Sequence, residues 1–275
     1  MYGLERSTGW ARWKVHVSGG IAAQVLRHRD VALTVALGGT VRAVELASGR
    51  PIWQTEGPEG VAGTYSGDPT IHDGNLFVAW RRGWMDSVDA ATGEVLWRRR
   101  IDATLNTSAA LFRGEIVVGT LAGRIIRFDP ETGAVLGGFD PGQKGGAFYG
   151  DLVPAEGCLL ALQASSATND LPELAAPHSL LCMEPARRRI RWQIDVTAPW
   201  SSLRPLVWDG TVIIGHAGEV RAVDLATGAI RRSWSIDGTP RGLGGSDAYL
   251  LVGTREGELL ALPWTGKEGD SLATP

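Results

Sequence analysis

The sequence lacks most of the features that would assign it to a special class of protein. Only two of its 275 residues are cysteine, Cys158 and Cys182, which excludes a scaffold built on disulfides. No segment approaches the run of about 18 apolar residues that a transmembrane helix needs. The first residues contain no basic stretch followed by an apolar one, so no signal peptide is expected. We therefore expect a cytoplasmic protein that does not insert into membranes.

Charge of one sign and helical periodicity are also missing. The formal net charge is −3, which gives no broad attraction to nucleic acid, and no nucleic-acid partner is expected. No segment places apolar residues at the 3.6-residue period of an amphipathic helix. The sequence therefore predicts an all-β protein.

What the sequence does contain is an internal repeat. An acidic residue, a short turn with glycine and a tryptophan recur along the chain, most clearly in DAATGEVLW at residues 89–97. The acidic positions are Glu5, Glu45, Asp89, Asp129, Glu184 and Asp224, and Pro263 stands at a degenerate seventh. The spacings are 40, 44, 40, 55, 40 and 39 residues. A period near 40 indicates an array of similar structural units.

The residues around each acid predict a strand, a turn and a second strand. The positions one and four before the acid are apolar, and the position two before it is small in all but one repeat, so both faces of the first strand are expected to be covered. The acid is expected to accept hydrogen bonds from the turn, and the glycine supplies a positive φ. The tryptophan four residues later is expected to wedge between sheets. These repeat residues are Gly93, Gly133, Gly228, Trp13, Trp53, Trp97 and Trp192.

Each repeat is expected to form four strands, here called A to D in chain order, with a tight turn between A and B. Four-stranded units at this period are typical of a β-propeller. Six blades are predicted over residues 1–275 as one domain, with seven as the alternative. The C-terminal repeat has no strand D, so we expect residues 9–17, within the segment 1–17, to complete the last blade and close the ring. Residues 164–179 are expected to form an inserted loop in the fourth blade.

The run D-x-x-T-G-x-x-x-W at Asp89–Trp97 resembles the repeat of the PQQ-like, quinoprotein-type β-propellers. This resemblance implies one of two functions, because the superfamily contains both quinoprotein alcohol dehydrogenases and non-catalytic scaffolds such as the outer-membrane assembly lipoprotein. The enzymes have eight blades, a calcium ion, a catalytic aspartate and typically adjacent cysteines beside the cofactor. The chain has no adjacent cysteines and too few repeats. We therefore expect a non-enzyme without a cofactor.

The remaining reactive side chains receive structural explanations. Cys158 and Cys182 occupy strand positions that small residues fill in other repeats, so free thiols are favoured over a disulfide. The five histidines have no ligand spacing, and no metal site is expected. Arginine runs at 98–100 and 187–191 are expected to be solvated charges on outer strands.

One group of residues is not explained by the repeat. WRRGW, from Trp80 to Trp84, is expected to form the loop between strands B and C of the second blade, where other repeats have small or polar residues. Loops expected on the same face add further aromatic residues. A cluster of aromatic residues and arginines suggests a partner-binding surface, although these rings could instead plug the central channel. The candidate residues are Trp80, Arg81, Arg82, Trp84, Phe148, Tyr149 and Trp200.

The function predicted from the sequence is therefore that of a scaffold or sensor propeller that binds another protein. Through the resemblance, an accessory subunit of a signalling or ATPase complex is expected. The alternative is a quinoprotein-like enzyme or a propeller that binds a small ligand.

Overall fold

A computed structural model describes residues 1–21, 23–61, 67–141, 146–164, 178–196, 204–216, 218–246 and 248–264. The chain divides into two compact units, Met1–Leu152 and Val153–Pro275. The inserted loop expected at 164–179 falls mostly outside the described residues. Among the residues that are described, no helix is long and apolar enough to cross a membrane.

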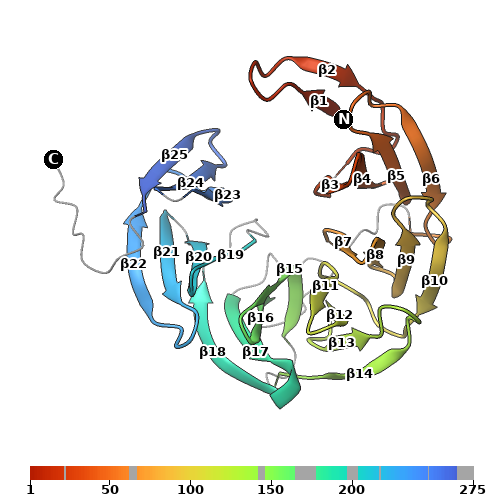
Figure 1. Cartoon of the computed structure of the whole chain (residues 1–275). Helices are drawn as coiled ribbons and strands as arrows, with labels where there is room; N and C mark the ends of the chain where they lie inside the picture. Colours follow the sequence, from red (N-terminus) through yellow and green to blue (C-terminus); the bar gives the residue numbers. More distant parts are fainter. Residues whose placement is uncertain are drawn as a thin grey trace. The chain divides into compact units, whose positions relative to one another are not determined.

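The first unit consists of antiparallel sheets that follow one another in chain order (Figure 1). A two-stranded sheet, β1–β2, is followed by three four-stranded sheets, β3–β6, β7–β10 and β11–β14. The strands are β1 (Tyr2–Leu4), β2 (Ala11–Lys14), β3 (Leu26–His28), β4 (Val31–Ala36), β5 (Thr40–Glu45), β6 (Pro51–Glu56), β7 (Thr70–His72), β8 (Asn75–Trp80), β9 (Trp84–Asp89), β10 (Val95–Arg100), β11 (Ala110–Phe112), β12 (Glu115–Gly119), β13 (Ile125–Phe128) and β14 (Val135–Phe139).

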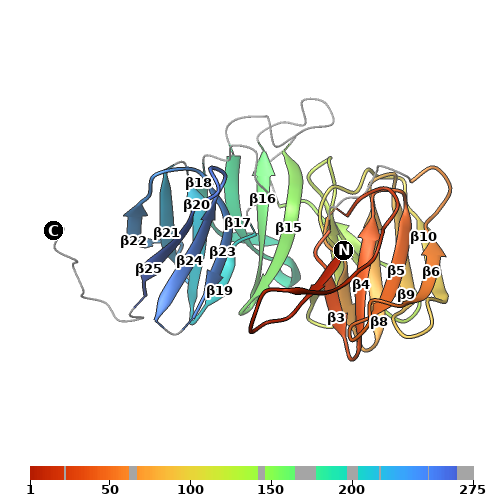
Figure 2. The same ribbon diagram turned by 90° about the horizontal axis from the view of Figure 1, so that it is seen from above.

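The second unit repeats the same arrangement. Its sheets are β15–β18, β19–β22 and the three-stranded β23–β25, and Figure 2 shows the strands of the last sheet side by side. The boundary between the units falls within β15. The strands are β15 (Ala147–Ala155), β16 (Cys158–Ala164), β17 (His178–Glu184), β18 (Arg189–Val196), β19 (Leu206–Trp208), β20 (Thr211–His216), β21 (Glu219–Asp224), β22 (Ile230–Ser235), β23 (Pro240–Gly245), β24 (Tyr249–Thr254) and β25 (Leu259–Pro263), and a 3-10 turn spans Pro185–Arg187.

The prediction of repeated four-stranded antiparallel units is confirmed. The expected closing pair is not seen in the described residues, because β2 pairs with β1 and the sheet β23–β25 has three strands. Since β1 already occupies one edge of β2, pairing of this edge with β25 would require β1 to move away. The single ring and its blade count therefore stay predictions.

Successive residues of one strand contribute to two different cores, as the sequence pattern predicts for a strand with sheets on both sides. Leu76 and Val78 of β8 lie in a cluster with residues of the sheet β3–β6. Phe77 and Ala79 lie in a second cluster with residues of the sheet β11–β14. A strand buried on both faces has apolar residues at consecutive positions, which explains the sequence NLFVAW.

The repeated acid closes its turn by accepting hydrogen bonds, as expected. Asp89 Oδ1 accepts from the backbone N–H groups of Ala91 and Thr92 at 2.9 and 2.7 Å, and from the Thr92 hydroxyl at 2.9 Å. These hydrogen bonds lower the pKa of Asp89, and the bond from the Thr92 backbone N–H contributes most. Asp129 and Asp224 receive the same bonds from their threonines. The acids therefore have a structural function in their turns.

The glycine and the tryptophan of the repeat meet between neighbouring sheets. A Cβ atom on the glycine would lie 2.6–2.7 Å from the indole of the preceding sheet, so the ring packs directly over the glycine backbone. The indole N–H also donates to a carbonyl of that same turn, at 2.8–3.3 Å. The pairs are Trp13 with Gly49, Trp53 with Gly93, Trp97 with Gly133 and Trp192 with Gly228. Each of these rings lies against the turn of the next sheet, and Trp13 and Trp53 are half-buried.

The expectation of free thiols is wrong. Cys158 on β16 and Cys182 on β17 form a disulfide, with Cα atoms 5.9 Å apart. The two residues lie on adjacent antiparallel strands, where this separation suits a cross-link. Their place in a small-residue column describes packing and does not distinguish a thiol from a disulfide.

Comparing two glycines of the third repeat tests the contact between tryptophan and glycine. Both have positive φ, 68° at Gly133 and 81° at Gly114, but only Gly133 lies under a ring, that of Trp97, and Gly114 has no atom near its missing Cβ. We expect Gly133→Ala to lower the free energy of unfolding by about 1 kcal/mol or more beyond the loss for Gly114→Ala, because only the first forces the indole to move. Urea denaturation measures both; equal losses would contradict the contact.

Candidate functional site

The WRRGW segment is a tight hairpin rather than an open loop. Strand β8 extends through Trp80 and β9 begins at Trp84, and these two residues pair directly. Arg81 is half-buried and Arg82 is exposed. The segment therefore presents an arginine to solvent between two tryptophans that belong to the sheet.

The premise that Trp80 is an exposed interface anchor is wrong. Its exposed fraction is 0%, and it lies in the core cluster formed with the sheet β3–β6. A Cβ atom on Gly57 would lie 2.8 Å from its ring. Alignment of the repeats with one another ends the second strand before Trp80 and assigns this residue to a loop. In the structure Trp80 is the last residue of β8 and belongs to the core.

Trp80 also belongs to a buried polar network. Its indole N–H donates to Asp86 Oδ2 at 3.0 Å. Arg98 donates to both oxygens of the same carboxylate at 2.9 Å, and to the backbone oxygen of Glu56 at 3.0 Å. Asp86 is 1% exposed, and desolvation raises its pKa although Arg98 and Trp80 act in the opposite direction. The network links β8, β9 and β10 to the end of β6, and sequence analysis missed it because Asp86 lies outside the repeated positions.

Trp84 retains part of the expected surface character. It is half-buried, and the Arg100 guanidinium carbon lies 5.2 Å from its ring centroid, within the range of a cation–π contact. Arg82, Trp84 and Arg100 therefore form the accessible part of the candidate surface.

The other candidate residues do not join this surface. Phe148 and Tyr149 are 0% and 3% exposed and lie in β15 rather than in a loop. Asn106 donates to the Phe148 carbonyl at 2.7 Å, and a Cβ atom on Gly119 would lie 2.9 Å from the Phe148 side chain. Both are core residues, and Trp200 lies outside the described residues.

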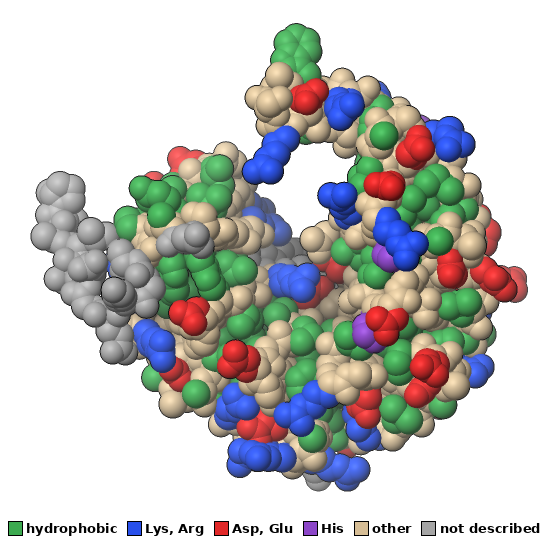
Figure 3. Space-filling model, viewed as in Figure 1, with side chains coloured by type: hydrophobic (Ala, Val, Ile, Leu, Met, Phe, Trp, Pro, Cys, Tyr) green, Lys and Arg blue, Asp and Glu red, His purple; other side chains and the backbone are tan. Residues whose placement is uncertain are grey.

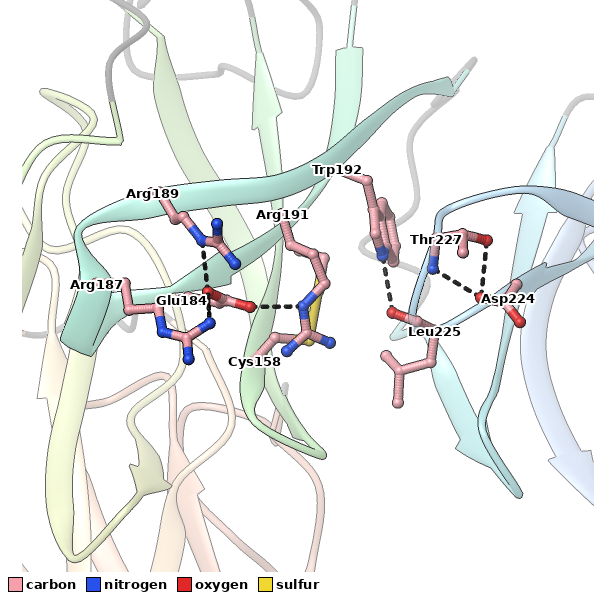
Figure 4. Close-up of polar contacts among 10 residues, drawn as sticks. Cys158, Glu184, Arg187, Arg189, Arg191, Trp192, Asp224, Leu225 and Thr227 are labelled. Atoms are coloured by element: carbon pink, nitrogen blue, oxygen red, sulfur yellow. Dashed lines mark hydrogen bonds and ion pairs between the residues drawn. A yellow bond between two sulfur atoms is a disulfide. The ribbon is translucent and has the colours of Figure 1, made fainter.

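A second cluster of charge replaces the usual turn of the fourth repeat. β17 ends at Glu184, and Arg187 and Arg188 stand where most other repeats have a threonine and a glycine. Figure 4 shows three guanidinium groups around this carboxylate. Arg187, Arg189 and Arg191 donate to it at 3.3, 2.6 and 2.8 Å. The arginine run is thus partly an ion-pair cluster around one acid rather than only solvated charge.

The ion pairs change the titration of the buried carboxylate. Hydrogen bonds from Arg189 and Arg191 lower the pKa of Glu184 from 4.5 to about 2, whereas Arg187 and Arg189 remain 70% and 55% exposed. The carboxylate is therefore charged at any physiological pH and holds the turn closed.

No metal centre is found among the described residues, since no three acidic, histidine or cysteine side chains gather there. The described side chains therefore pack the sheets, close the turns and place exposed arginines at the surface.

Comparison with known proteins places this chain in a family. Residues 37–242 match the family described as outer membrane protein assembly factor BamB, well over half of the chain. The chain belongs to this BamB family of PQQ-type repeat proteins. Its fold is similar to the crystal structure of BamB from Moraxella catarrhalis, with a TM-score of 0.72 at 16% identity over 95% of this chain and 78% of that one. A computationally designed protein, Ika8, gives a TM-score of 0.68 at 15% identity over 92% and 74%.

Curated relatives match over shorter segments. The dehydrogenase subunit of the quinone alcohol dehydrogenase of Gluconacetobacter polyoxogenes is 33% identical over 81 residues, 26% of this chain and 11% of that protein. The serine/threonine-protein kinase AfsK of Streptomyces griseus is 29% identical over 125 residues, 42% of this chain and 16% of that protein. The chain thus spans only a small part of either relative, and these matches describe the shared repeat. The prediction of a PQQ-like β-propeller fold is confirmed.

Truncating Trp80 tests its place in the core. We expect Trp80→Ala to lower the free energy of unfolding by about 3–5 kcal/mol, the range for a large buried aromatic. Trp80→Phe keeps most of the packing but leaves Asp86 without one donor, so a loss of about 1–3 kcal/mol is expected. Urea denaturation distinguishes them, and a loss under about 1 kcal/mol for Trp80→Ala would mean that the ring is not buried.

The arginine cluster predicts a particular pH dependence. Because the pKa of Glu184 is lower in the folded protein than its ordinary 4.5, its contribution to stability is fully present above about pH 4.5 and is lost as the pH falls toward 2. Glu184→Gln should therefore be less stable than the wild type at pH 7, and the difference should vanish near pH 2. Denaturant unfolding from pH 7 to pH 2 measures this, with the exposed turn variant Glu131→Gln as control. A difference independent of pH would contradict the ionic role.

Proposed function

We propose that this chain is a non-catalytic propeller that acts as a scaffold or sensor subunit of a larger protein assembly. The observation that carries the proposal is its membership of a family described as an assembly factor. The use of Asp89, Asp129 and Asp224 in turn closure supports it, because side chains committed to turns are poor candidates for acid–base chemistry.

The partner is proposed to be another protein that contacts the hairpin between β8 and β9. Arg82 is exposed there, and Trp84 with Arg100 provides an aromatic ring beside a second cation. Arginine and aromatic residues dominate the centres of protein interfaces. Similarity to the kinase AfsK supports the expected signalling assembly; an ATPase complex stays a prediction.

Site-specific cross-linking tests this surface. A photoreactive residue in place of Arg82 should yield an adduct heavier than the chain in its native host, because the side chain faces the partner. The same residue in place of Glu131, on an exposed turn, serves as control and should yield none. Adducts at position 131 alone, or at neither position, would argue against the hairpin.

A quinone-dependent enzyme is the second candidate, which the match to the alcohol dehydrogenase subunit favours. Incubation with pyrroloquinoline quinone and calcium, followed by a search for a bound chromophore, separates the two functions.

The cytoplasmic location stays a prediction, and the Cys158–Cys182 disulfide favours an oxidising compartment instead.

A further inference from the structure

An excess of positive charge gathers where β17 turns into β18. Residues 184–191, here called the arginine turn, contain four arginines and one glutamate, a formal charge of +3. Arg187, Arg188 and Arg189 are exposed, and Figure 3 shows Lys and Arg side chains gathered over β18. Glu156 is exposed in the turn before β16, at the same end of the sheet, but this one acid leaves the excess positive. Closing the turn around a single carboxylate does not account for so many cations.

The contacts with Glu184 use only part of the donors that the arginine turn carries. Arg189 and Arg191 donate through Nε at 2.6 and 2.8 Å, and Arg187 donates through Nη1 at 3.3 Å. Each guanidinium has five N–H groups, and in Figure 4 no dashed line reaches the terminal nitrogens of Arg189 and Arg191. Within the described part of the chain, Glu184 is the only carboxylate that pairs with these arginines. Their remaining N–H groups can therefore receive carboxylates of another molecule.

The arginine turn is held in place before any ligand binds. Pro185–Arg187 form a 3-10 turn, which the Arg188 backbone N–H closes by donating to the Pro185 carbonyl at 3.2 Å. Cys182, near the end of β17, is cross-linked to Cys158 of the neighbouring strand. A group that is fixed in advance loses less conformational freedom on binding. The fold thus presents preorganised cations rather than freely moving side chains.

A second arginine extends the charge to the next sheet of the same unit. Arg191 and Arg231 stand seven residues after the acids of their turns, and each pairs with its own acid. Three sheets of the first unit have aliphatic residues at this position, 42–45% exposed; they are Ile52, Leu96 and Leu136. The two arginine-bearing turns are neighbours, because the Trp192 indole N–H donates to the Leu225 carbonyl at 2.8 Å. Cations therefore line two adjacent turns of the second unit.

We infer that the arginine turn, together with Arg231 on the next sheet, binds an acidic segment of a protein partner, a stretch of chain with several Asp or Glu residues. The guanidinium groups already pair with carboxylates of their own chain, and the forked geometry of guanidinium suits further carboxylates. The inference rests on the proposed scaffold function, because it names a second contact of the scaffold and the chemistry of its partner.

The exposure of the arginines favours an extended segment over a small anion. Arg187 and Arg189 are 70% and 55% exposed, so no wall encloses a free anion, and a single exposed ion pair contributes little. A segment with several carboxylates engages several guanidinium groups at once. Single-stranded nucleic acid fits less well, because it binds through bases stacked on accessible rings, and Trp192, the aromatic residue next to Arg191, is buried.

Fluorescence anisotropy with a labelled octaglutamate peptide and the full chain tests this inference. The wild type should bind the peptide at low ionic strength and release it as salt is added, because exposed charges are screened. Arg187→Gln with Arg188→Gln removes two exposed cations and leaves Arg189 and Arg191 on Glu184. This double variant should bind about fivefold or more weakly, with an unchanged melting temperature.

Arg27→Gln with Arg29→Gln is the matched control. Both of these arginines are exposed, and Arg29 has the same left-handed backbone conformation as Arg188, with φ of 51° and 50°. The control removes the same charge from the first unit and should bind the peptide like the wild type. Ala186→Glu, at an exposed residue of the arginine turn, keeps every arginine and should also weaken binding, because it adds a charge of the same sign as the peptide.

Four outcomes would overturn the inference. They are a wild type without salt-sensitive peptide binding, equal weakening by the two double variants, displacement of the peptide by inorganic phosphate at matched ionic strength, and tighter binding of an oligothymidylate of the same length. The measurement is independent of the cross-linking at Arg82. Adducts there without peptide binding would remove this inference and leave the proposed function standing.

Discussion

The contact of one indole ring with the turn of the next sheet is the interaction on which the rest of the structure depends. The ring lies over a glycine that has no room for a Cβ atom, and its N–H donates to a carbonyl of the same turn. Apolar burial and a hydrogen bond therefore act at one place. The acid accepts hydrogen bonds within this turn and holds its conformation. The acid and the glycine of one sheet therefore act together with the tryptophan of the preceding sheet.

This contact has a direction, and the direction gives each sheet two unlike faces. The face with the tryptophan and the small residue receives the next sheet, and the face one residue out of phase receives the preceding one. Because side chains alternate along a strand, each apolar residue packs against only one of the two neighbouring sheets.

The sequence was sufficient for the parts of the molecule that follow the repeat and insufficient where the repeat is broken. The acids, turns and strands could be predicted because each position is sampled several times in one chain. Trp80 could not, since its column holds threonine, glutamine and histidine elsewhere and only the depth of Asp86 shows why a ring with a donor belongs there. The disulfide was missed because a small buried column accepts cysteine in either oxidation state. The arginines near Glu184 have the pattern of surface charge in the sequence, and only the fold shows that they surround the acid of a turn that has lost its threonine and glycine.

These departures are the places where packing within the repeat does not explain the sequence. Most repeats close their turn with one threonine, whereas the fourth uses three arginines, two of them more than half exposed. One carboxylate can neutralise only one of three guanidinium groups, so the cluster keeps excess positive charge at the surface, which the threonine turn would not supply. In the second repeat, by contrast, Arg98 is matched with Asp86 and its charge is cancelled inside the protein. Charge that is cancelled stabilises the sheet, and charge left over at a turn is available to a partner. The functional surface of such a repeat protein is therefore to be sought among exposed residues that break the pattern.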